Sequence, residues 1–422
     1  MAKQFDVIVI GAGPGGYTAA LKATEFGLKV AVIETKKIGG TCVNRGCIPT
    51  KALLYASGMF RMMQNCDEFG VSTDFISFDF QKMQSYKKKA VDRYRGSVEG
   101  LFEKNHVEVI YGKGTLRRGR TVEVELAEGG REFFEGKTVI LAAGAVPMMN
   151  EIPGADLPGV WNSDRLLAAK SWNFDRLTIM GGGVIAVEFA TLFNNLCSNV
   201  TIVEKKKHLM APMDDVMSTA LERVLRRKGI QVYCDSTVTE LSQGENGLNC
   251  VITPNKGGEP IRTRAGQVLM AIGRKPNVQG LCGPDVSLEM KNGKIAVSSG
   301  VSVDKVNPGC LCHRRCVCRY SAGPCSGSPG YICGGKKLPA VLILYGFSQY
   351  PAVCMFPFPL CLTVFIRIRR LLPLALRRRK RACGGLRCDV VIFPWRKMDV
   401  PLSQGNRTAL SVWCLKPTAI PL

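Results

Sequence analysis

The first third of the chain alternates short apolar runs with amphipathic stretches. Residues 5–10 (FDVIVI) are typical of a buried strand, residues 17–27 of a helix that ends at Gly27, and residues 29–34 (KVAVIE) of a second strand. The same order returns at residues 177–204 (LTIMGGGVIAVEFATLFNNLCSNVTIVE). The pattern therefore predicts two right-handed βαβ units.

The segments around these units continue the α/β pattern. Residues 52–100 are predicted to be helical, and residues 107–116 and 120–145 to be strands and turns. Residues 217–234 indicate a helix followed by a strand, and residues 266–277 a strand that ends in a glycine turn. The pattern extends to about Val303. The predicted fold class is α/β, with two Rossmann-like dinucleotide-binding domains.

Each predicted unit carries a glycine-rich turn before its helix. Such glycines permit a tight turn and close approach of the backbone to a pyrophosphate, and the helix N-terminus supplies free N–H groups. In both units 23 residues separate the first glycine from an acid, Glu34 or Glu204, that would bind ribose hydroxyls. Glu204 favours NAD over NADP, although Lys205 to Lys207 follow it. Two ordinary glycine turns in a parallel sheet are the alternative. The positions that match G-x-G-x-x-G/A are Gly11, Gly13 and Gly16, then Gly181, Gly183 and Ala186.

Charge and cysteine are concentrated at the C-terminal end of the 422-residue chain. Residues 307–422 hold 18 Lys and Arg against Asp389 and Asp399, so +16 of the net +23 lies there and +7 remains for residues 1–306. Eleven of the 18 cysteines also lie there. The first 306 residues thus have the ordinary charge balance of an enzyme, and no nucleic-acid partner is expected.

Residues 39–51 (GGTCVNRGCIPTK) contain two cysteines, Cys42 and Cys47. A zinc site needs four ligands, and residues 1–306 offer only His106, His208 and scattered single cysteines, so no metal site is predicted there. The sequence begins in a strand with no visible secretory leader, which indicates a cytoplasmic protein, or a mitochondrial or plastid one if a leader is missing. Structural disulfides are rare in the cytosol. A reversible redox pair beside a flavin fits better than a structural disulfide.

This segment closely resembles the active-site segment of the flavin disulfide reductase family, and its Ile-Pro-Thr-Lys continuation is most similar to the dihydrolipoamide dehydrogenases within it. The resemblance covers residues 1 to about 303. It implies an FAD domain at residues 1–147, an NAD domain at 148–276 and a return to the FAD domain at 277–306. It also implies that Cys42 exchanges with lipoamide, that Cys47 contacts the flavin, and that Lys51 lies near it.

The resemblance further implies a set of cofactor contacts. The FAD contacts are Gly11, Gly13, Gly16, Glu34, Gly40, Thr41, Lys51, Gly114, Ala143, Gly144 and Ala145, and the NAD contacts are Gly181, Gly183, Val184, Ile185, Ala186, Glu188, Glu204, Val238 and Gly273. The turn at Ala142 to Ala145 departs from the family's Ala-Thr-Gly-Ser because both hydroxyls are missing.

The tail from Asn307 departs from the family. Neither the expected strand that ends in Gly-Asp nor the His–Glu pair of the C-terminal dimerisation domain appears in it. Residues 309–336 can be back-translated with allowed codons so that a one-nucleotide shift reads VYAIGDVCAGIQLAHVAAHQGISAVE, which resembles the missing segment. We therefore predict that residues 307–422 are an out-of-frame, unstructured or non-native tail.

The implied function is oxidation of protein-bound dihydrolipoamide with NAD⁺ through FAD and a Cys42–Cys47 disulfide, with this chain poorly active. The implied partners are lipoyl domains of 2-oxo acid dehydrogenase or glycine cleavage complexes, and a second copy of the chain. One alternative is another flavin disulfide reductase or a diaphorase. The other is a membrane-anchored or metal-binding protein that uses residues 310–318 (CLCHRRCVC) and the apolar run 339–366, although prolines interrupt that run.

Overall fold

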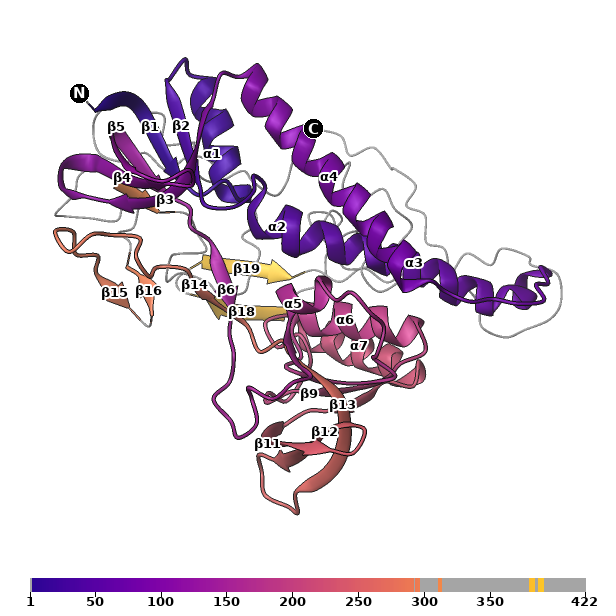
Figure 1. Cartoon of the computed structure of the whole chain (residues 1–422). Helices are drawn as coiled ribbons and strands as arrows, with labels where there is room; N and C mark the ends of the chain where they lie inside the picture. The colour runs from indigo at the N-terminus through magenta and orange to yellow at the C-terminus, as the bar shows by residue number, and fades with distance from the viewer. Residues whose placement is uncertain (1, 292, 297–309, 313–378, 384–385, 391–422) are drawn as a thin grey trace, which may run out of the picture. The chain divides into compact units, whose positions relative to one another are not determined.

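The computed structural model describes residues 2–291, 293–296, 310–312, 379–383 and 386–390 (Figure 1). The chain divides into two compact units, Met1–Pro357 and Phe358–Leu422. In the second unit the described residues form one antiparallel pair of strands, β18 (Arg379–Cys383) and β19 (Leu386–Val390). The two large sheets and all described helices belong to the first unit.

The first sheet is a parallel sheet with an antiparallel extension. Its parallel strands run in the order β3-β2-β1-β5-β17, and β4 pairs antiparallel with both β3 and β5. The bounds are β1 (Lys3–Ile10), β2 (Val30–Glu34), β3 (Glu108–Leu116), β4 (Thr121–Leu126), β5 (Arg131–Leu141) and β17 (Cys310–Cys312).

Both faces of this sheet are covered, which explains the unbroken apolar run in β1. Val7 and Val9 pack with residues of α1 (Pro14–Thr24) and α4 (Phe80–Lys104) on one face. Ile8 and Ile10 point to the other face, against β4 and the returning residues Leu281 to Ile295. Successive side chains of a strand alternate between faces, so a strand buried on both sides must be apolar throughout.

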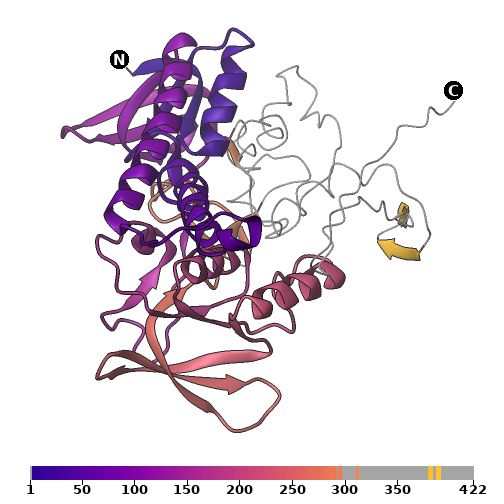
Figure 2. The ribbon, with the colours of Figure 1, turned by 90° about the vertical axis from the view of Figure 1, so that its right-hand side faces the viewer.

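The second sheet repeats the first. Its parallel strands run in the order β10-β9-β8-β13-β7, and β12 and β11 extend it antiparallel from β13. Figure 2 shows these long antiparallel strands at the lower edge of the view. The bounds are β7 (Val160–Asn162), β8 (Arg176–Met180), β9 (Asn199–Val203), β10 (Gln231–Tyr233), β11 (Ser236–Gly244), β12 (Gly247–Pro254) and β13 (Ile261–Met270), with helices α5 (Ser163–Leu167), α6 (Val184–Asn195) and α7 (Asp215–Arg227). The predicted α/β class with two Rossmann-like sheets is confirmed.

The chain leaves the first sheet and returns to it through a two-stranded ribbon. β6 (Ala145–Pro147) pairs antiparallel with β14 (Arg274–Pro276). The boundaries predicted after residues 147 and 276 fall at this ribbon. The returning segment then forms β15 (Met290–Lys291) and β16 (Lys294–Ile295), and Ile295 is buried against the first sheet.

The region expected to be helical over residues 52–100 is interrupted. α2 (Gly40–Arg45) and α3 (Cys47–Gln64) are followed by a short 3₁₀ turn, η1 (Cys66–Phe69), and α4 begins only at Phe80. Gly70 adopts a φ of +75°, and the Asp79 side chain caps α4 by accepting from the Lys82 N–H at 3.0 Å. A left-handed glycine and an acidic cap are ordinary stop and start signals, and the sequence prediction missed them. A second 3₁₀ turn, η2 (Arg118–Arg120), precedes β4.

The structure describes three short segments of the tail, and the prediction of a non-native tail stays a prediction. β17, β18 and β19 are strands, and β17 pairs parallel with β5, with Cys310 opposite Val139. Strand pairing uses backbone N–H and C=O groups, so this pairing depends little on the side chains of β17. Most of the predicted cysteine cluster and all of residues 339–366 lie outside the described residues. Within the described part of the chain, no helix combines the length and the apolar character that crossing a bilayer requires.

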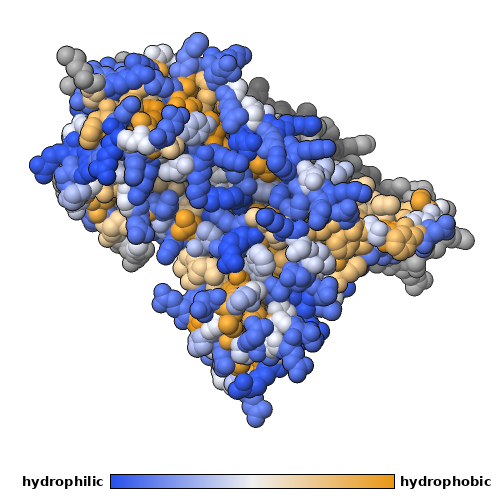
Figure 3. Space-filling view, in the orientation of Figure 1, coloured by the Kyte–Doolittle hydropathy of each residue, from blue (hydrophilic) through white to orange (hydrophobic). Residues whose placement is uncertain are grey.

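Large apolar side chains are exposed near the C-terminal end of α3. Met59, Met62, Met63, Phe69 and Phe75 are between 42% and 83% exposed, and we refer to them as the Met-Phe patch. Figure 3 shows apolar surface over this end of α3, whereas most of the remaining face in view is hydrophilic. Contiguous exposed apolar surface is typical of a protein–protein contact.

Candidate functional site

The first glycine turn is held by backbone contacts that exclude side chains. Gly11 has a φ of +105°, and a Cβ there would lie 2.4 Å from the Ala142 carbonyl oxygen. A Cβ at Gly16 would lie 1.7 Å from the Gly11 carbonyl oxygen. The Gly11 N–H donates to the Ile33 carbonyl at 2.7 Å. The turn, β2 and the end of β5 thus meet at one point, at the carboxyl ends of the parallel strands.

The second glycine turn repeats this geometry. Gly181 also has a φ of +105°, and a Cβ there would lie 2.6 Å from the Ala271 carbonyl oxygen. Its N–H donates to the Val203 carbonyl at 2.8 Å. Ala186, which takes the place of Gly16, is fully buried. The two motifs therefore match in residue spacing and also in the hydrogen bond from the first glycine to the second strand.

The two predicted ribose acids are fixed beside these turns in the same way. Glu34 accepts from the Ala12 N–H at 2.8 Å and from the Lys36 N–H at 2.9 Å. Glu204 is hydrogen-bonded to the Gly182 N–H and accepts from the Lys206 N–H at 2.7 Å. The sequence analysis missed these bonds to the backbone, although the identical spacing in the two units was their signal. Each carboxylate is held in place and keeps lone pairs for a further donor.

Helices α1 and α6 begin without side-chain caps, as α2 and α3 also do. Their N-cap residues, Gly13 and Gly183, make no side-chain cap, and neither first turn contains an acid. By contrast, Asp79, Asn162 and Asp214 cap α4, α5 and α7. A Cβ at Gly183 would meet nothing within 4 Å. Uncapped N–H groups at a helix N-terminus fit the phosphates of a dinucleotide, so both turns are compatible with the predicted cofactors.

The cysteine segment packs directly against the first glycine turn. Cys42 lies in α2 and Cys47 is the first residue of α3, and both are half-buried. Gly40 has a φ of +56°, and a Cβ there would lie 2.5 Å from the Gly13 Cα. The Gly39 N–H donates to the Ala12 carbonyl at 2.9 Å. The structure therefore brings the predicted redox segment, including Thr41, to the predicted FAD turn. The pairing of the two sulfurs stays a prediction.

An ion pair connects this segment to the second domain. Lys51 Nζ in α3 lies 2.5 Å from Glu188 Oε1 in α6, and their side chains are 30% and 7% exposed. Nearby, the Asn195 amide donates to the Ser57 hydroxyl at 3.3 Å. Lys51 was predicted beside the flavin and Glu188 against NAD. Because 137 residues separate the two, no local pattern in the sequence could pair them.

The other predicted contacts lie around the two sheets. Gly144 has a φ of +75° and its carbonyl accepts from the Asn277 N–H at 3.0 Å, while Gly273 has a φ of +141°. A Cβ at Gly114 would lie 3.1 Å from the Ile33 side chain, so a larger residue there would crowd Ile33. Val238 is 2% exposed within an apolar cluster, which gives its side chain a core role. All the predicted cofactor contacts, including those of Gly114, Ala143, Ala145, Val184, Ile185 and Val238, stay predictions.

Two cysteines outside this segment have raised pKa values. Burial raises the pKa of Cys250 to about 11, and burial together with Glu222 raises that of Cys234 to about 11. Both thiols are therefore protonated at neutral pH. Among residues 2–291, 293–296 and the described strands of the tail, no group of three or more His, Cys, Asp or Glu could hold a metal ion.

The comparisons with known proteins agree with this geometry. The family described as "Pyridine nucleotide-disulphide oxidoreductase" matches residues 5–306. The dihydrolipoyl dehydrogenase of Bacillus subtilis is 33% identical over 308 residues, which cover 71% of this chain and 64% of that protein. The dihydrolipoyl dehydrogenase of Acholeplasma laidlawii is 35% identical over 300 residues, which cover 70% of this chain and 85% of that protein.

A solved structure is also similar to this chain. It is the Cu(II) complex of the HOCl-induced flavoprotein disulfide reductase RclA from Escherichia coli, with a TM-score of 0.62 and 26% identity. The match covers 74% of this chain and 66% of that one. The chain thus spans about two thirds of the length of several proteins that it matches. On the family match and the two bacterial relatives, the chain belongs to the pyridine nucleotide-disulphide oxidoreductase family.

Proposed function

We propose that this chain is a dihydrolipoyl dehydrogenase that transfers electrons from protein-bound dihydrolipoamide to NAD⁺. One observation carries the proposal: the two-cysteine segment packs on the Gly11–Gly16 turn, and Lys51 in the same segment pairs with α6 of the second domain. A disulfide that oxidises a dithiol is itself reduced to two thiolates, so it must transfer two electrons to another acceptor. The contacts of this segment with the Gly11–Gly16 turn and with α6 support electron transfer from the sulfur pair to both cofactors.

The chain's own residues supply the sulfur chemistry. A substrate thiolate attacks Cys42 Sγ, the Cys42–Cys47 bond breaks, and Cys47 leaves as a thiolate. The second substrate thiolate then attacks the substrate sulfur of the mixed disulfide, which releases Cys42 as a thiolate and closes the lipoamide disulfide. Two electrons have moved from substrate to protein. FAD, when bound, supplies the electron transfer from this pair of thiolates to NAD⁺.

The remaining residues bind and orient. The uncapped N–H groups of α1 and α6 would hold the two pyrophosphates, and Glu34 and Glu204 would accept hydrogen bonds from ribose hydroxyls. A carboxylate at Glu204 repels a 2′-phosphate, which supports NAD rather than NADP, although the exposed Lys205 to Lys207 would attract one. The ion pair with Glu188 fixes the position of the Lys51 ammonium group, four residues after Cys47.

The proposal includes a low turnover for the 422-residue chain. Residues 307–422 contain no counterpart of the family's His–Glu pair, which the resemblance implies for accepting the substrate's proton. The proposed partners are lipoyl domains and a second copy of the chain, for which the Met-Phe patch offers exposed apolar surface.

The test is the reduction of one sulfur pair by dihydrolipoamide. Full-length chain, with and without FAD, is treated anaerobically with dihydrolipoamide, freed of reagent and alkylated for mass mapping. We expect two new thiols per chain, at Cys42 and Cys47. In the Cys42→Ser variant, dihydrolipoamide should produce no new thiols. In the matched Cys66→Ser variant, it should still produce new thiols at Cys42 and Cys47. Unchanged labelling of residues 42 and 47 in FAD-loaded protein would refute the proposal.

A general disulfide reductase is the second candidate. The similarity to the RclA structure favours it, because that protein is named a flavoprotein disulfide reductase. NADH oxidation by FAD-loaded chain with a panel of disulfides and dyes separates the two. Faster turnover with another disulfide than with lipoamide would favour this second candidate.

A further inference from the structure

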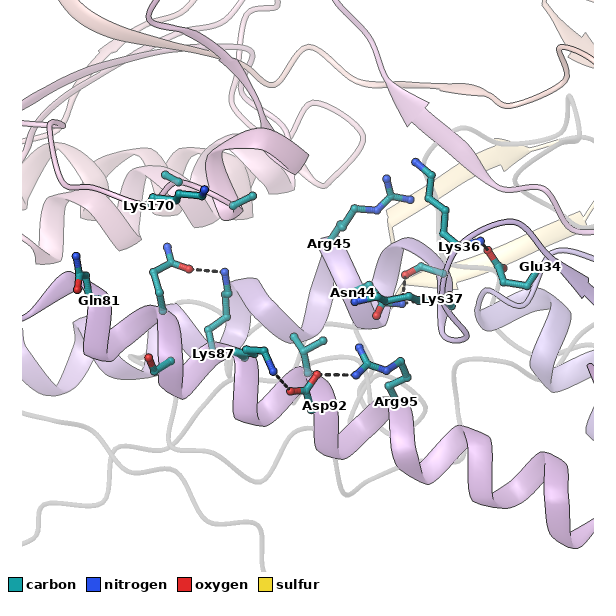
Figure 4. Close-up of a pocket in the computed structure, with 17 residues that line it drawn as sticks. Glu34, Lys36, Lys37, Asn44, Arg45, Gln81, Lys87, Asp92, Arg95 and Lys170 are labelled. Atoms are coloured by element: carbon teal, nitrogen blue, oxygen red, sulfur yellow. Dashed lines mark hydrogen bonds and ion pairs between the residues drawn. The ribbon is translucent and has the colours of Figure 1, made fainter. Parts of the chain in front are cut away.

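A basic cavity lies along α4. It has a volume of about 790 Å³ and is bounded by α4, the residues that follow α5, the end of α2 and the loop after β2 (Figure 4). A volume of this size is typical of small-molecule sites. Eleven of its 17 lining residues belong to α4 or to residues 168–170.

Positive side chains dominate the cavity wall. Seven cations and two carboxylates line it, an excess of five positive charges; the cations are Lys36, Lys37, Arg45, Lys87, Lys88, Arg95 and Lys170. Both carboxylates are engaged. Glu34 is held by backbone N–H groups, and Asp92 lies 2.6 Å from Lys88 and 2.7 Å from Arg95. Arg45 also pairs with Asp164, and Arg95 with Glu99, each at 3.6 Å. Among the described residues no carboxylate pairs with the other four cations, which are Lys36, Lys37, Lys87 and Lys170.

Two buried polar atoms in the wall, one on Gln84 and one on Asn44, have no hydrogen-bond partner among the described residues. Lys87 is partly buried, which lowers its pKa, and it donates to the Leu167 carbonyl at 2.6 Å and to the Gln84 side chain. Gln84 Nε2 is buried and has no hydrogen-bond partner among the described residues. An unpaired buried donor is destabilising, and a hydrogen bond to an anion in the cavity would remove that cost. Asn44 Oδ1, also buried and unpaired, could accept the hydroxyl of a hydrogen phosphate.

This cavity extends well beyond the predicted cofactor site. It shares only Glu34 and Gly40 with the predicted FAD contacts, and none of Gly11, Gly13 or Gly16 lines it. In Figure 4, Lys36, Lys37 and Arg45 lie at one end, and Lys87 and Lys170 lie toward the other. A ligand that reaches both ends needs more than one anionic group.

We propose that the cavity binds a small polyanion with at least two phosphate groups and no aromatic base, of the pyrophosphate kind. The separated cations call for two charged groups, and the free amide donor suits a phosphate oxygen. No Phe, Tyr, Trp or His is among the lining residues, so a nucleotide base would find no ring to stack on. Asn44 and Arg45 belong to α2, the helix of Cys42, so the bound anion lies next to the redox segment.

The test is calorimetric titration of the full chain with inorganic pyrophosphate at low ionic strength, with and without saturating FAD. We expect one site per chain, unaffected by FAD. Lys170→Gln and Lys87→Gln should each weaken binding about tenfold, the lower end of what a hydrogen bond to a charged group contributes. The matched control is Lys89→Gln, an exposed lysine of α4 outside the cavity wall, which should change binding less than twofold.

Four results would overturn the proposal. The first is that millimolar pyrophosphate produces no heat of binding, and the second is that Lys89→Gln weakens binding as much as Lys170→Gln does. The third is that FAD competes with pyrophosphate, and the fourth is that citrate binds as tightly as pyrophosphate. Because Lys87 also holds the Leu167 carbonyl, its variant could unfold locally. The exposed Lys170 avoids this difficulty, and a thermal melt of Lys170→Gln that matches wild type completes the control.

Discussion

Removing the Lys51 ammonium should destabilise the contact between α3 and α6. In Lys51→Met the Glu188 carboxylate, which is 7% exposed, loses the ammonium group 2.5 Å away and stays buried. Breaking a fully buried pair costs about 3–5 kcal/mol. Lys51 is 30% exposed and partly solvated, so we expect a smaller loss of about 2 kcal/mol.

A double-mutant cycle separates the free energy of the ion pair from the effect of changing the Lys51 methylene chain. Glu188→Gln keeps a hydrogen-bond acceptor and should cost about 1 kcal/mol. In Lys51→Met/Glu188→Gln no buried charge is left unpaired, so the double variant should be more stable than the sum of the single losses by about 1 kcal/mol. The exposed pair between Lys88 and Asp92 is the matched control, and Lys88→Met should cost under about 0.5 kcal/mol.

The assay is urea unfolding followed by tryptophan fluorescence. The Trp172 ring stacks on Phe193 of α6, with centroids 5.6 Å apart, so its emission reports on this helix. A coupling free energy near zero, or a loss in Lys88→Met equal to that in Lys51→Met, would show that the ion pair does not stabilise the contact.

Further variants test the turns, the acids and the thiols. Gly11→Ala and Gly181→Ala should lower stability by about 2–3 kcal/mol, whereas Gly129→Ala, with a φ of +94° but open space, should lose only about 1 kcal/mol in thermal melts. Equal losses of stability in the three variants would show that the close backbone contacts of Gly11 and Gly181 are not what excludes a side chain there. Glu34→Gln should weaken FAD binding about tenfold in flavin fluorescence titrations and leave NADH binding unchanged, and Glu204→Gln should do the reverse. At pH 8, roughly one Cys250 thiol in a thousand is ionised with a pKa of about 11, so iodoacetamide should label exposed Cys197 first and Cys250 last, with Cys250 labelling rising as pH approaches 11. Rapid labelling of Cys250 in folded protein would argue against its burial.

Local patterns determined much of the site. The two glycine turns were predictable because a left-handed backbone and the near contact of Gly11 with Ala142 tolerate only glycine, and this leaves a signature in the sequence. The strands β1 and β8 were predictable because burial on both faces leaves only apolar residues. The spacing from each turn to Glu34 and Glu204 is set by one helix and one strand, so it also repeats in the sequence.

Tertiary structure alone decided which distant groups meet. Lys51 and Glu188 are 137 residues apart, and only the docking of α3 on α6 brings them together. The basic cavity likewise joins α4, residues 168–170 and the loop after β2, whose lysines look like ordinary solvated charges in the sequence. Val238 and Gly114 owe their burial to the packing of the sheets. Periodicity records which way a residue faces within its own helix or strand, but it contains no information about what another element places opposite.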